Sequence, residues 1–512
     1  MTTDAPPRSD SPTAVWLDGF AWLEEAAAEF QARHDVMTIV RIQHLRRTAV
    51  LFKNGRLDGV RESEIEGVGV QLFSREGESA IGSSNVVAED EIRALLDRTL
   101  AILRGSEGKV QGRNTEIWKA APLVAERILE TPFGIDAVGI TALKETLREH
   151  HERMRALGEG RDGELSVTSS GVAIEEEWLI VRGDGTRVRW NAPRFSLGNA
   201  FTVRRDGHAA STRSNRHGKD LAQLMDEDQR ATAEREAATF CDLAFRLHGT
   251  SPIKGGSYKI VIDPALAKGL AHEAFGHAAE SDAIRFSSIL GADEKFRQDL
   301  KICKDTVSII DTPIEGDWAD SPFSANGLRR RTVKIVDKGI LNEALADIYS
   351  AEEIGVAVTG ASRLQSYGDI PIPRMSNIRL EIEDALDWPH GDDTGPENLH
   401  RFLLDNELMS ADETVLYLVG YRGGQVNPKL GDYVFNCQAI YRFEQGETTL
   451  HPPAIFAGKV LETLESVVTG IGPLSIHHLG TCGKAGQGVP SSGGGHLFTI
   501  IDAHPAIHIG GR

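Results

Sequence analysis

Two histidines and a glutamate lie close together in the stretch LAHEAFGHAAESD, residues 270–282. In the zinc-site pattern H-E-x-x-H the imidazoles stand four residues apart on a helix, and the glutamate beside them acts as the base. Here His272 and His277 stand five apart, and Glu273 directly follows the first histidine. The stretch therefore offers two metal ligands and a general base. From these six residues alone, two histidines on a helix surface are an equally good interpretation.

The spacing of five residues makes a structural demand. At 3.6 residues per turn, positions i and i+5 point about 140° apart around a regular helix, so the two imidazoles would face different directions. A π-bulge, with its i→i+5 hydrogen bond, brings them onto one face, and such bulges are frequent at functional sites. Gly276 tolerates the distortion. We therefore predict a wide or broken turn around Ala274–His277.

A catalytic zinc site needs a third protein ligand and leaves one position for water. Glu280 and Asp282 are nearby carboxylates, but Cys482 has a more suggestive setting, because Gly480 and Gly483 flank it in the glycine-rich stretch HHLGTCGKAGQGVPSSGGGH. Backbone can approach a ligand closely there. The alternative for a lone cysteine is a small buried apolar residue.

The elements that would position these residues fall into two predicted domains, since 512 residues exceed one ordinary core. After a tail at 1–14 that we expect to be disordered, residues 15–250 alternate helical and strand patterns, with turn signals at Asn54-Gly55 and Asp184-Gly185. They predict an N-terminal domain with antiparallel strands and long helices. The predicted class of the whole chain is α+β.

Residues 251–512 predict a metal-binding domain built on a curved antiparallel sheet or barrel. Apolar strand patterns dominate it, and helical inserts are expected near 341–353, 396–408 and 454–469, packed outside the sheet. The run Gly423-Gly424-Gln425 lies in one of these strands. It is a candidate for contact with a substrate backbone, because glycine lets main chains pair closely. A plain bulge or turn is the alternative.

Bulk composition excludes several classes of protein. The formal net charge of −19 argues against a nucleic-acid partner, because phosphate binding needs basic clusters. The four cysteines form no C-x-x-C pair, which fits a reducing cytoplasm. The N-terminus is polar, and no run approaches 18 apolar residues, so we expect a cytoplasmic protein without a signal peptide or membrane span.

Four motifs, in order, resemble the TldD/PmbA (TldD/TldE) zinc metalloprotease family. HEAFGHAAESD is similar to the family's H-E-A-x-G-H-x-x-E-x-D, and SYGDIPIPRMSN (366–377) to its P-x-P-R-M-[ST]-N segment. YRGGQVNPKLGDYVF (421–435) resembles its G-G-Q-V strand pair, and GTCGKAGQGVP (480–490) its C-G-K-x-G-Q-x-x-P loop. Together the motifs span roughly residues 258–512.

This resemblance implies a Zn²⁺-dependent peptidase in which His272, His277 and Cys482 bind the metal and Glu273 is the general base. All four positions are present, as in the catalytic rather than the inactive member of the family. The resemblance also implies a dimer, with an inactive PmbA/TldE-like paralogue or with itself. It implies extended, unfolded substrates, such as leader-type precursors of peptide natural products or small unfolded proteins. The alternatives are a non-catalytic peptide-binding subunit and a TldD-like scaffold used in biosynthetic tailoring.

Overall fold

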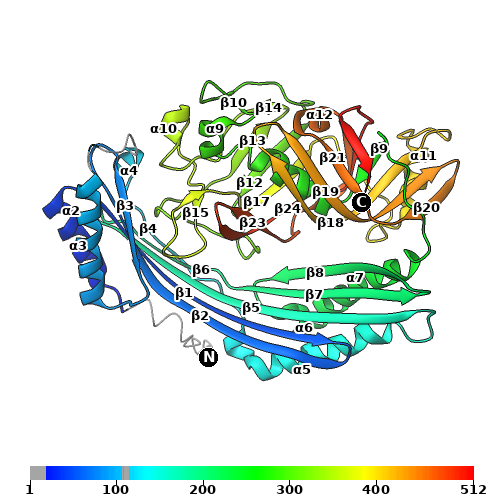
Figure 1. Ribbon diagram of the computed structural model, residues 1–512, viewed down its shortest axis with the longest axis horizontal. Helices are drawn as coiled ribbons and strands as arrows, with labels where there is room; N and C mark the ends of the chain where they lie inside the picture. Colours follow the sequence, from blue (N-terminus) through cyan, green and yellow to red (C-terminus); the bar gives the residue numbers. More distant parts are fainter. Residues whose placement is uncertain (1–18, 107, 109–114, 512) are drawn as a thin grey trace, which may run out of the picture.

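The structure is a computed structural model that describes residues 19–106, 108 and 115–511. The predicted α+β class is confirmed: two large sheets carry helices on their outer sides (Figure 1). The tail predicted to be disordered, residues 1–14, lies outside the described residues. The last strand of the first sheet ends at Gly218, and the first strand of the second sheet begins at Lys259, with two helices between them.

The first sheet has eight strands in the order β3-β2-β1-β5-β6-β4, with β7 against β5 and β8 against β7. All its pairs are antiparallel except β4 with β6. The turns predicted at Asn54-Gly55 and Asp184-Gly185 connect β1 to β2 and β5 to β6. The strands are β1 (Met37–Lys53), β2 (Arg56–Phe73), β3 (Ser79–Ser84), β4 (Val124–Arg127), β5 (Glu164–Arg182), β6 (Arg187–Asn191), β7 (Arg194–Arg205) and β8 (His208–Gly218).

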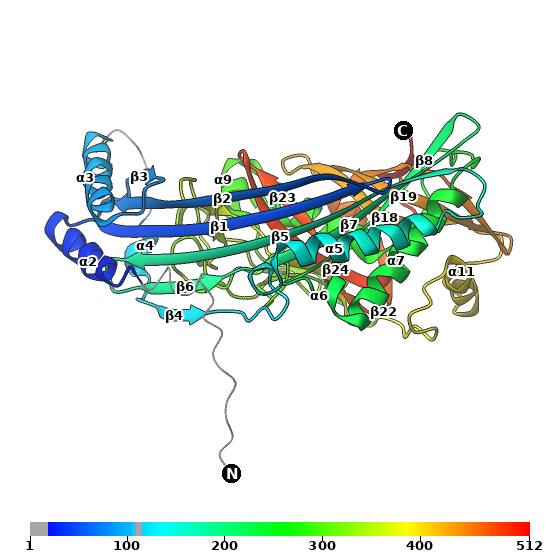
Figure 2. The same ribbon diagram turned by 90° about the horizontal axis from the view of Figure 1, so that it is seen from below.

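Long helices cover the face of this sheet that points away from the C-terminal half (Figure 2). They are α5 (Ile135–Ala156) and α7 (Glu227–Arg246), preceded by the short α6 (Ala222–Met225), while α2 (Trp22–His34), α3 (Glu89–Ser106) and α4 (Glu116–Lys119) lie at one end. Buried His151 ties α5 to the sheet. Its Nε2 accepts the N–H of Gly55 at 3.0 Å, and its Nδ1 lies 3.0 Å from Ser169 Oγ.

The second sheet has thirteen strands in the order β14-β13-β12-β17-β24-β9-β18-β19-β21-β25, with β20 on β19 and β22 and β23 on β24. Its strands are β9 (Lys259–Ile262), β12 (Val307–Thr312), β13 (Val333–Asp337), β14 (Ile340–Leu341), β17 (Asn377–Ile382), β18 (Val415–Asn427), β19 (Asp432–Glu444), β20 (Glu447–His451), β21 (Ile455–Lys459), β22 (Val467–Ser475), β23 (Gly480–Lys484), β24 (Gln487–Ile501) and β25 (Ile507–Gly510). Two-stranded ribbons add β10 (Gly291–Ala292) with β11 (Lys295–Phe296), and β15 (Ser362–Arg363) with β16 (Ile372–Pro373).

Of the two predicted forms, a curved antiparallel sheet and a barrel, the structure has a sheet, and most of its strand pairs are antiparallel. The sheet is mixed, because β17 pairs with β24 and β18 with β9 in parallel. It is also open, since its path over the described residues ends at β14 and β25, which do not pair with each other. Parallel pairs need long crossover connections, and these carry the chain away from simple hairpin closure.

The helices of the C-terminal half are α8 (Pro264–Gly269), the π-helix η1 (Leu270–Gly276), α9 (Ser281–Ser287), α10 (Ala351–Ile354), α11 (Pro396–Asp405) and α12 (Val460–Glu465). Of the three predicted helical inserts, α11 agrees well with the structure. The insert at 341–353 shrinks to α10, because Leu345 N–H bonds to Ala279 O instead of continuing a helix. The insert at 454–469 begins as strand β21.

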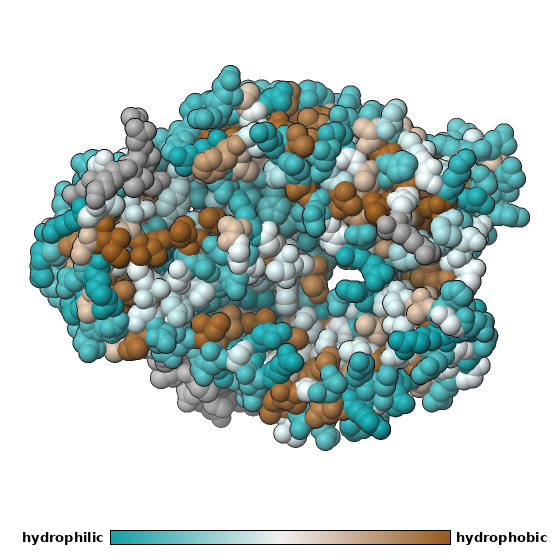
Figure 3. Space-filling model, in the orientation of Figure 1, coloured by the Kyte–Doolittle hydropathy of each residue, from teal (hydrophilic) through white to brown (hydrophobic). Residues whose placement is uncertain are grey.

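The long sheet curves beneath the C-terminal half (Figure 1). Side chains from both halves connect the two. Gln438 bonds with its side chain to both the N–H and the C=O of Arg213, at 2.8 and 3.0 Å. Arg194 Nε donates to Trp318 O at 2.8 Å. The molecular surface is hollowed between the two halves (Figure 3). In the described part of the chain, no helix has the length and apolar character needed to span a membrane.

Candidate metal centre

The helical turn predicted to be widened is a π-helix. Asp263 caps α8 by accepting the N–H of Leu266 at 2.8 Å, and η1 continues α8 without a break. The N–H of His277 then donates to His272 O at 3.2 Å, an i→i+5 bond. The prediction is confirmed, with the distortion beginning earlier, at Leu270. Gly276 leaves room for Met375, since a Cβ there would lie 1.8 Å from Met375 Sδ and the methionine side chain would have to move.

This turn brings the two histidines together with the distant cysteine. Ligand atoms of His272, His277 and Cys482 all lie within 4.8 Å of one another. The imidazole rings are 5.1 Å apart and nearly perpendicular, and His277 Nε2 lies 3.5 Å from Cys482 Sγ. Among the described residues, none hydrogen-bonds to the buried Nδ1 of His272, which is unusual for a buried polar atom. Two imidazoles and a thiol are the donor set that zinc prefers, so the residues fit that metal.

A buried carboxylate orients His277. Glu280, which is fully buried, places Oε2 3.0 Å from His277 Nδ1, so the ring nitrogen facing Cys482 is the one left for a ligand. Lys484 binds the same carboxylate at 2.7 Å and Asp282 at 2.6 Å. Glu280 and Asp282, which the sequence offered as possible ligands, therefore contact this lysine. Neither belongs to the group of three donors.

The thiol of Cys482 is held in a polarised environment. The residue lies on β23, opposite Val489 of β24, and Arg374 donates a hydrogen bond to its carbonyl. Burial raises the pKa of the thiol, but the hydrogen bond and charge of His277, together with Arg374, outweigh burial and hold this pKa below its ordinary value. A thiol of this kind is readily available as a thiolate ligand.

Glu273 lines an open cavity of about 470 Å³ together with His277, Gly424 and Thr481. Burial raises the pKa of the Glu273 carboxyl, and the positive charges of His277 and Lys268 oppose that rise. The hydroxyl of Tyr421 lies 3.5 Å from Glu273 Oε1. Sequence reasoning missed Tyr421 and Lys268. The only sequence signal for Lys268 is its place four residues before His272, one helical turn away.

Of the predicted substrate-contacting run, Gly424 and Gln425 line this cavity and Gly423 does not. Gly423 has φ +100°, and the pairing of β18 with β19 shifts register between Tyr421 and Gly424, so the bulge that was the alternative interpretation is present. On its other side, β18 pairs with β9 only over Val415–Leu418. Among the described residues no strand pairs with that side of β18 beyond Leu418.

Comparisons with known proteins assign the chain to a family. Residues 255–485 match the PmbA/TldA metallopeptidase C-terminal domain, and residues 39–103 match PmbA/TldA metallopeptidase domain 1. A protein of Methanothermobacter thermautotrophicus named "Metalloprotease" is 28% identical over 471 residues, which is 91% of this chain and 94% of the relative. A "Zinc metalloprotease TldD homolog" of Saccharolobus solfataricus is 30% identical over 260 residues, 49% of this chain and 51% of the relative.

The fold has a counterpart among solved structures. The crystal structure of TldE from Thermococcus kodakarensis matches with a TM-score of 0.70 at 13% identity, covering 96% of this chain and 100% of that one. At that identity the match concerns the fold alone. The two family matches lie in both halves of the molecule, and the C-terminal one contains the π-helix η1 and strand β23 with Cys482. The chain belongs to the TldD/PmbA family of metallopeptidases.

Proposed function

We propose that this protein is a zinc-dependent peptidase in which His272, His277 and Cys482 hold the metal and Glu273 is the general base. The observation that carries the proposal is the convergence of three donor atoms within 4.8 Å, from chain segments about two hundred residues apart, beside a carboxylate in an open cavity. The zinc named for one relative supports the choice of metal.

The chemistry follows from the side chains around the cavity. Zinc bound by these residues would supply a Lewis acid and acidify a water molecule. Glu273 takes the proton of the attacking water and returns a proton to the leaving amine, and a carboxyl whose pKa is raised by burial suits both steps. The hydroxyl of Tyr421 donates a hydrogen bond to the Glu273 carboxylate. Glu280 fixes the ring of His277.

We propose extended, unfolded peptides as the substrates. Beyond Gly420, whose N–H donates to Asp263 Oδ2 at 2.6 Å, none of the described strands pairs with this side of β18, which runs toward Gly424 and Gln425 in the same cavity as Glu273. A peptide that adds to such an edge gains main-chain hydrogen bonds, which give affinity with little dependence on sequence. Precursors of peptide natural products and small unfolded proteins both meet this description. A folded protein does not, because its backbone is already paired.

A TldE-like paralogue or a second copy of the chain is the proposed dimer partner, and light scattering of the protein with and without the paralogue tests it. The family membership and the TldE-like fold support this partnership.

The peptidase proposal is tested with Glu273→Gln. Purified protein should carry one zinc per chain and cleave unfolded peptides, whereas Glu273→Gln should keep the zinc and lose about 100-fold or more in kcat/KM. Glu447→Gln, an exposed carboxylate on β20, is the matched control and should behave as wild type. Undiminished cleavage by Glu273→Gln contradicts the assigned base. Failure to bind zinc even on reconstitution favours a non-catalytic peptide-binding subunit.

A further inference from the structure

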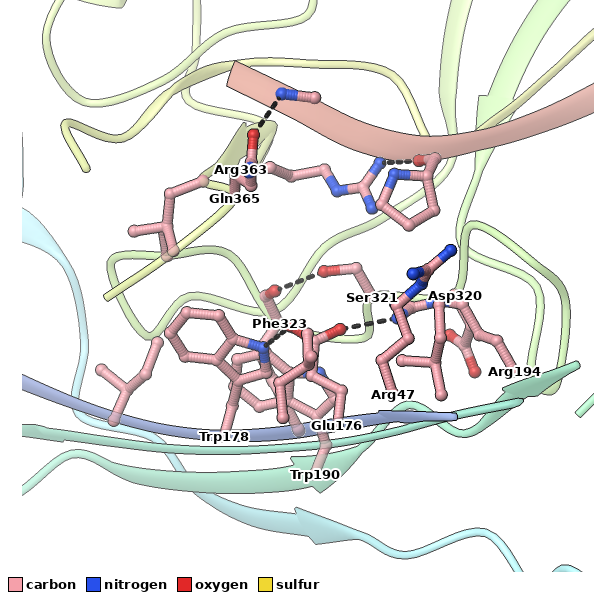
Figure 4. Close-up of a pocket in the computed structure, with 17 residues that line it drawn as sticks. Arg47, Glu176, Trp178, Trp190, Arg194, Asp320, Ser321, Phe323, Arg363 and Gln365 are labelled. Carbon is pink, nitrogen blue, oxygen red and sulfur yellow. Dashed lines mark hydrogen bonds and ion pairs between the residues drawn. The ribbon is translucent and has the colours of Figure 1, made fainter. Parts of the chain in front are cut away.

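A second cavity, of about 330 Å³, lies between the two halves of the molecule (Figure 4). One wall is the inner face of the first sheet, where Trp178 of β5 and Trp190 of β6 stack with ring centroids 5.9 Å apart and planes at 13°. Phe323, from the opposite half, packs against Trp190 at 5.7 Å. The volume falls in the range of about 300–1,000 Å³ that is typical of ligand sites. Three aromatic rings suit a flat apolar group.

The cavity also carries uncompensated positive charge. Arg47, Arg194 and Arg363 line it, together with the carboxylates of Glu176 and Asp320. Glu176 binds Arg194 at 2.6 Å, and Asp320 binds an arginine outside the cavity, also at 2.6 Å. In the described part of the chain, no ion pair with a carboxylate is found for Arg47 or Arg363. Burial and the charges of other arginines lower the pKa of Arg363 to about 9, so it is still charged near neutral pH.

The cavity adjoins the candidate metal centre through a single hairpin. Thr481 and Gly483, on either side of Cys482, line the cavity of the metal centre. Their partners on β24, Pro490 and Gly488, line the aromatic cavity. Paired residues on adjacent antiparallel strands stand about 5 Å apart. Because an extended peptide advances about 3.3 Å per residue, a few residues are enough to pass from one cavity to the other.

We propose that the aromatic cavity is a subsite that binds an aromatic side chain next to a carboxylate on the substrate peptide. The aromatic ring packs against Trp178, Trp190 and Phe323. The carboxylate accepts hydrogen bonds from the planar fork of Arg47 and from Nη2 of Arg363, whose Nη1 already donates to two backbone carbonyls at 2.7 Å. The carboxylate comes from the C-terminus of the peptide or from an acidic side chain beside the aromatic residue. That the ligand is a peptide rests on the proposed function.

The test measures fluorescence anisotropy of labelled unfolded peptides that share one core sequence, bound to full-length, zinc-loaded Glu273→Gln protein so that they are not cut. The first peptide ends in phenylalanine with a free carboxylate, and the second ends in phenylalanine amide. The third contains an internal Phe-Glu pair and has an amidated end. The fourth ends in alanine with a free carboxylate. We expect the first peptide to bind about tenfold more tightly than the second, the value of one charged hydrogen-bonded contact. The third peptide decides between the two sources of the carboxylate, and the fourth should bind no better than the second.

Two variants separate the subsite from general effects. Arg47→Glu reverses an exposed charge, so it should remove the preference for the carboxylate and leave the affinity for the amide unchanged. Arg56→Glu, at an exposed arginine of β2, is the control and should keep the preference. Leu364→Trp fills the cavity from a half-buried position and should weaken the aromatic peptides to the level of the alanine peptide.

Equal affinity for the first, second and fourth peptides overturns the subsite, as does a preference that survives Arg47→Glu. Absence of binding by all four peptides also overturns it. The proposed function can fail separately. If the peptides show the binding preference but the wild-type protein cleaves none of them, the subsite is supported and the peptidase proposal is refuted. If all peptides are cleaved and neither binding nor KM shows a preference, only the subsite proposal is refuted.

Discussion

Replacing Glu280 with glutamine removes the negative charge that faces His277 and leaves the size of the side chain almost unchanged. In the structure this carboxylate lies 3.0 Å from His277 Nδ1 and 2.7 Å from Lys484, and the residue is fully buried. The variant keeps a side chain that can hydrogen-bond to the ring but no longer raises the basicity of its other nitrogen.

The expected loss is about 30-fold in zinc affinity, or about 2 kcal/mol, within the ~10- to 100-fold range for groups that orient a metal-binding histidine. Asp282→Asn is the matched control. It removes the other carboxylate of Lys484, at 2.6 Å, without touching His277, and should bind zinc nearly as tightly as wild type.

Competition with a chromophoric chelator measures both affinities, and circular dichroism of the metal-free proteins checks that each is folded. Wild-type affinity in a folded Glu280→Gln protein would refute the role of this carboxylate. An equal loss in Asp282→Asn would instead assign the effect to the charge on Lys484.

Three further predictions concern activity, packing and acid stability. Tyr421→Phe should lower kcat about fivefold with little change in KM, the value of about 1 kcal/mol for one hydrogen bond to Glu273, and steady-state kinetics checks it. Gly276→Ala should lower the free energy of unfolding by about 1–3 kcal/mol in urea titrations, because the added Cβ would lie 1.8 Å from a methionine sulfur, whereas Gly483→Ala meets no atom within 4 Å and should cost little. Burial lowers the pKa of His151 to about 4, so its neutral form stabilises the fold fully above the unfolded pKa of about 6.5, and that stability is lost as pH falls toward 4. The protein should lose about 2 kcal/mol between pH 7 and pH 5 from this group, and His151→Gln should lose correspondingly less in unfolding titrations at the two pH values.

The local geometry of the metal centre could be predicted because backbone periodicity determines it. A helix repeats every 3.6 residues, so ligands five apart on one face require a widened turn, and η1 provides it. The hairpin at Asn54-Gly55 follows from turn chemistry in the same way, since both residues adopt positive φ, +47° and +81°. Each of these features depends on a few neighbouring residues.

Features that depend on long-range packing could not be predicted from local patterns. Lys484 reaches Glu280 across 204 positions, and Tyr421 reaches Glu273 across 148. Neither spacing carries a periodic signal. The parallel pairing of β9 with β18 was missed for the same reason: strand patterns tell which residues form a strand and not which strand lies beside it. The aromatic cavity arises only when the two sheets are packed together.

The most direct test of the account is X-ray absorption spectroscopy at the zinc edge of the zinc-loaded protein. The account predicts two nitrogen ligands at about 2.0–2.1 Å and one sulfur at about 2.3 Å, with the sulfur contribution lost in Cys482→Ser. If the zinc in the wild-type protein is bound only by nitrogen and oxygen, with no sulfur ligand, the result would contradict a metal site formed by His272, His277 and Cys482.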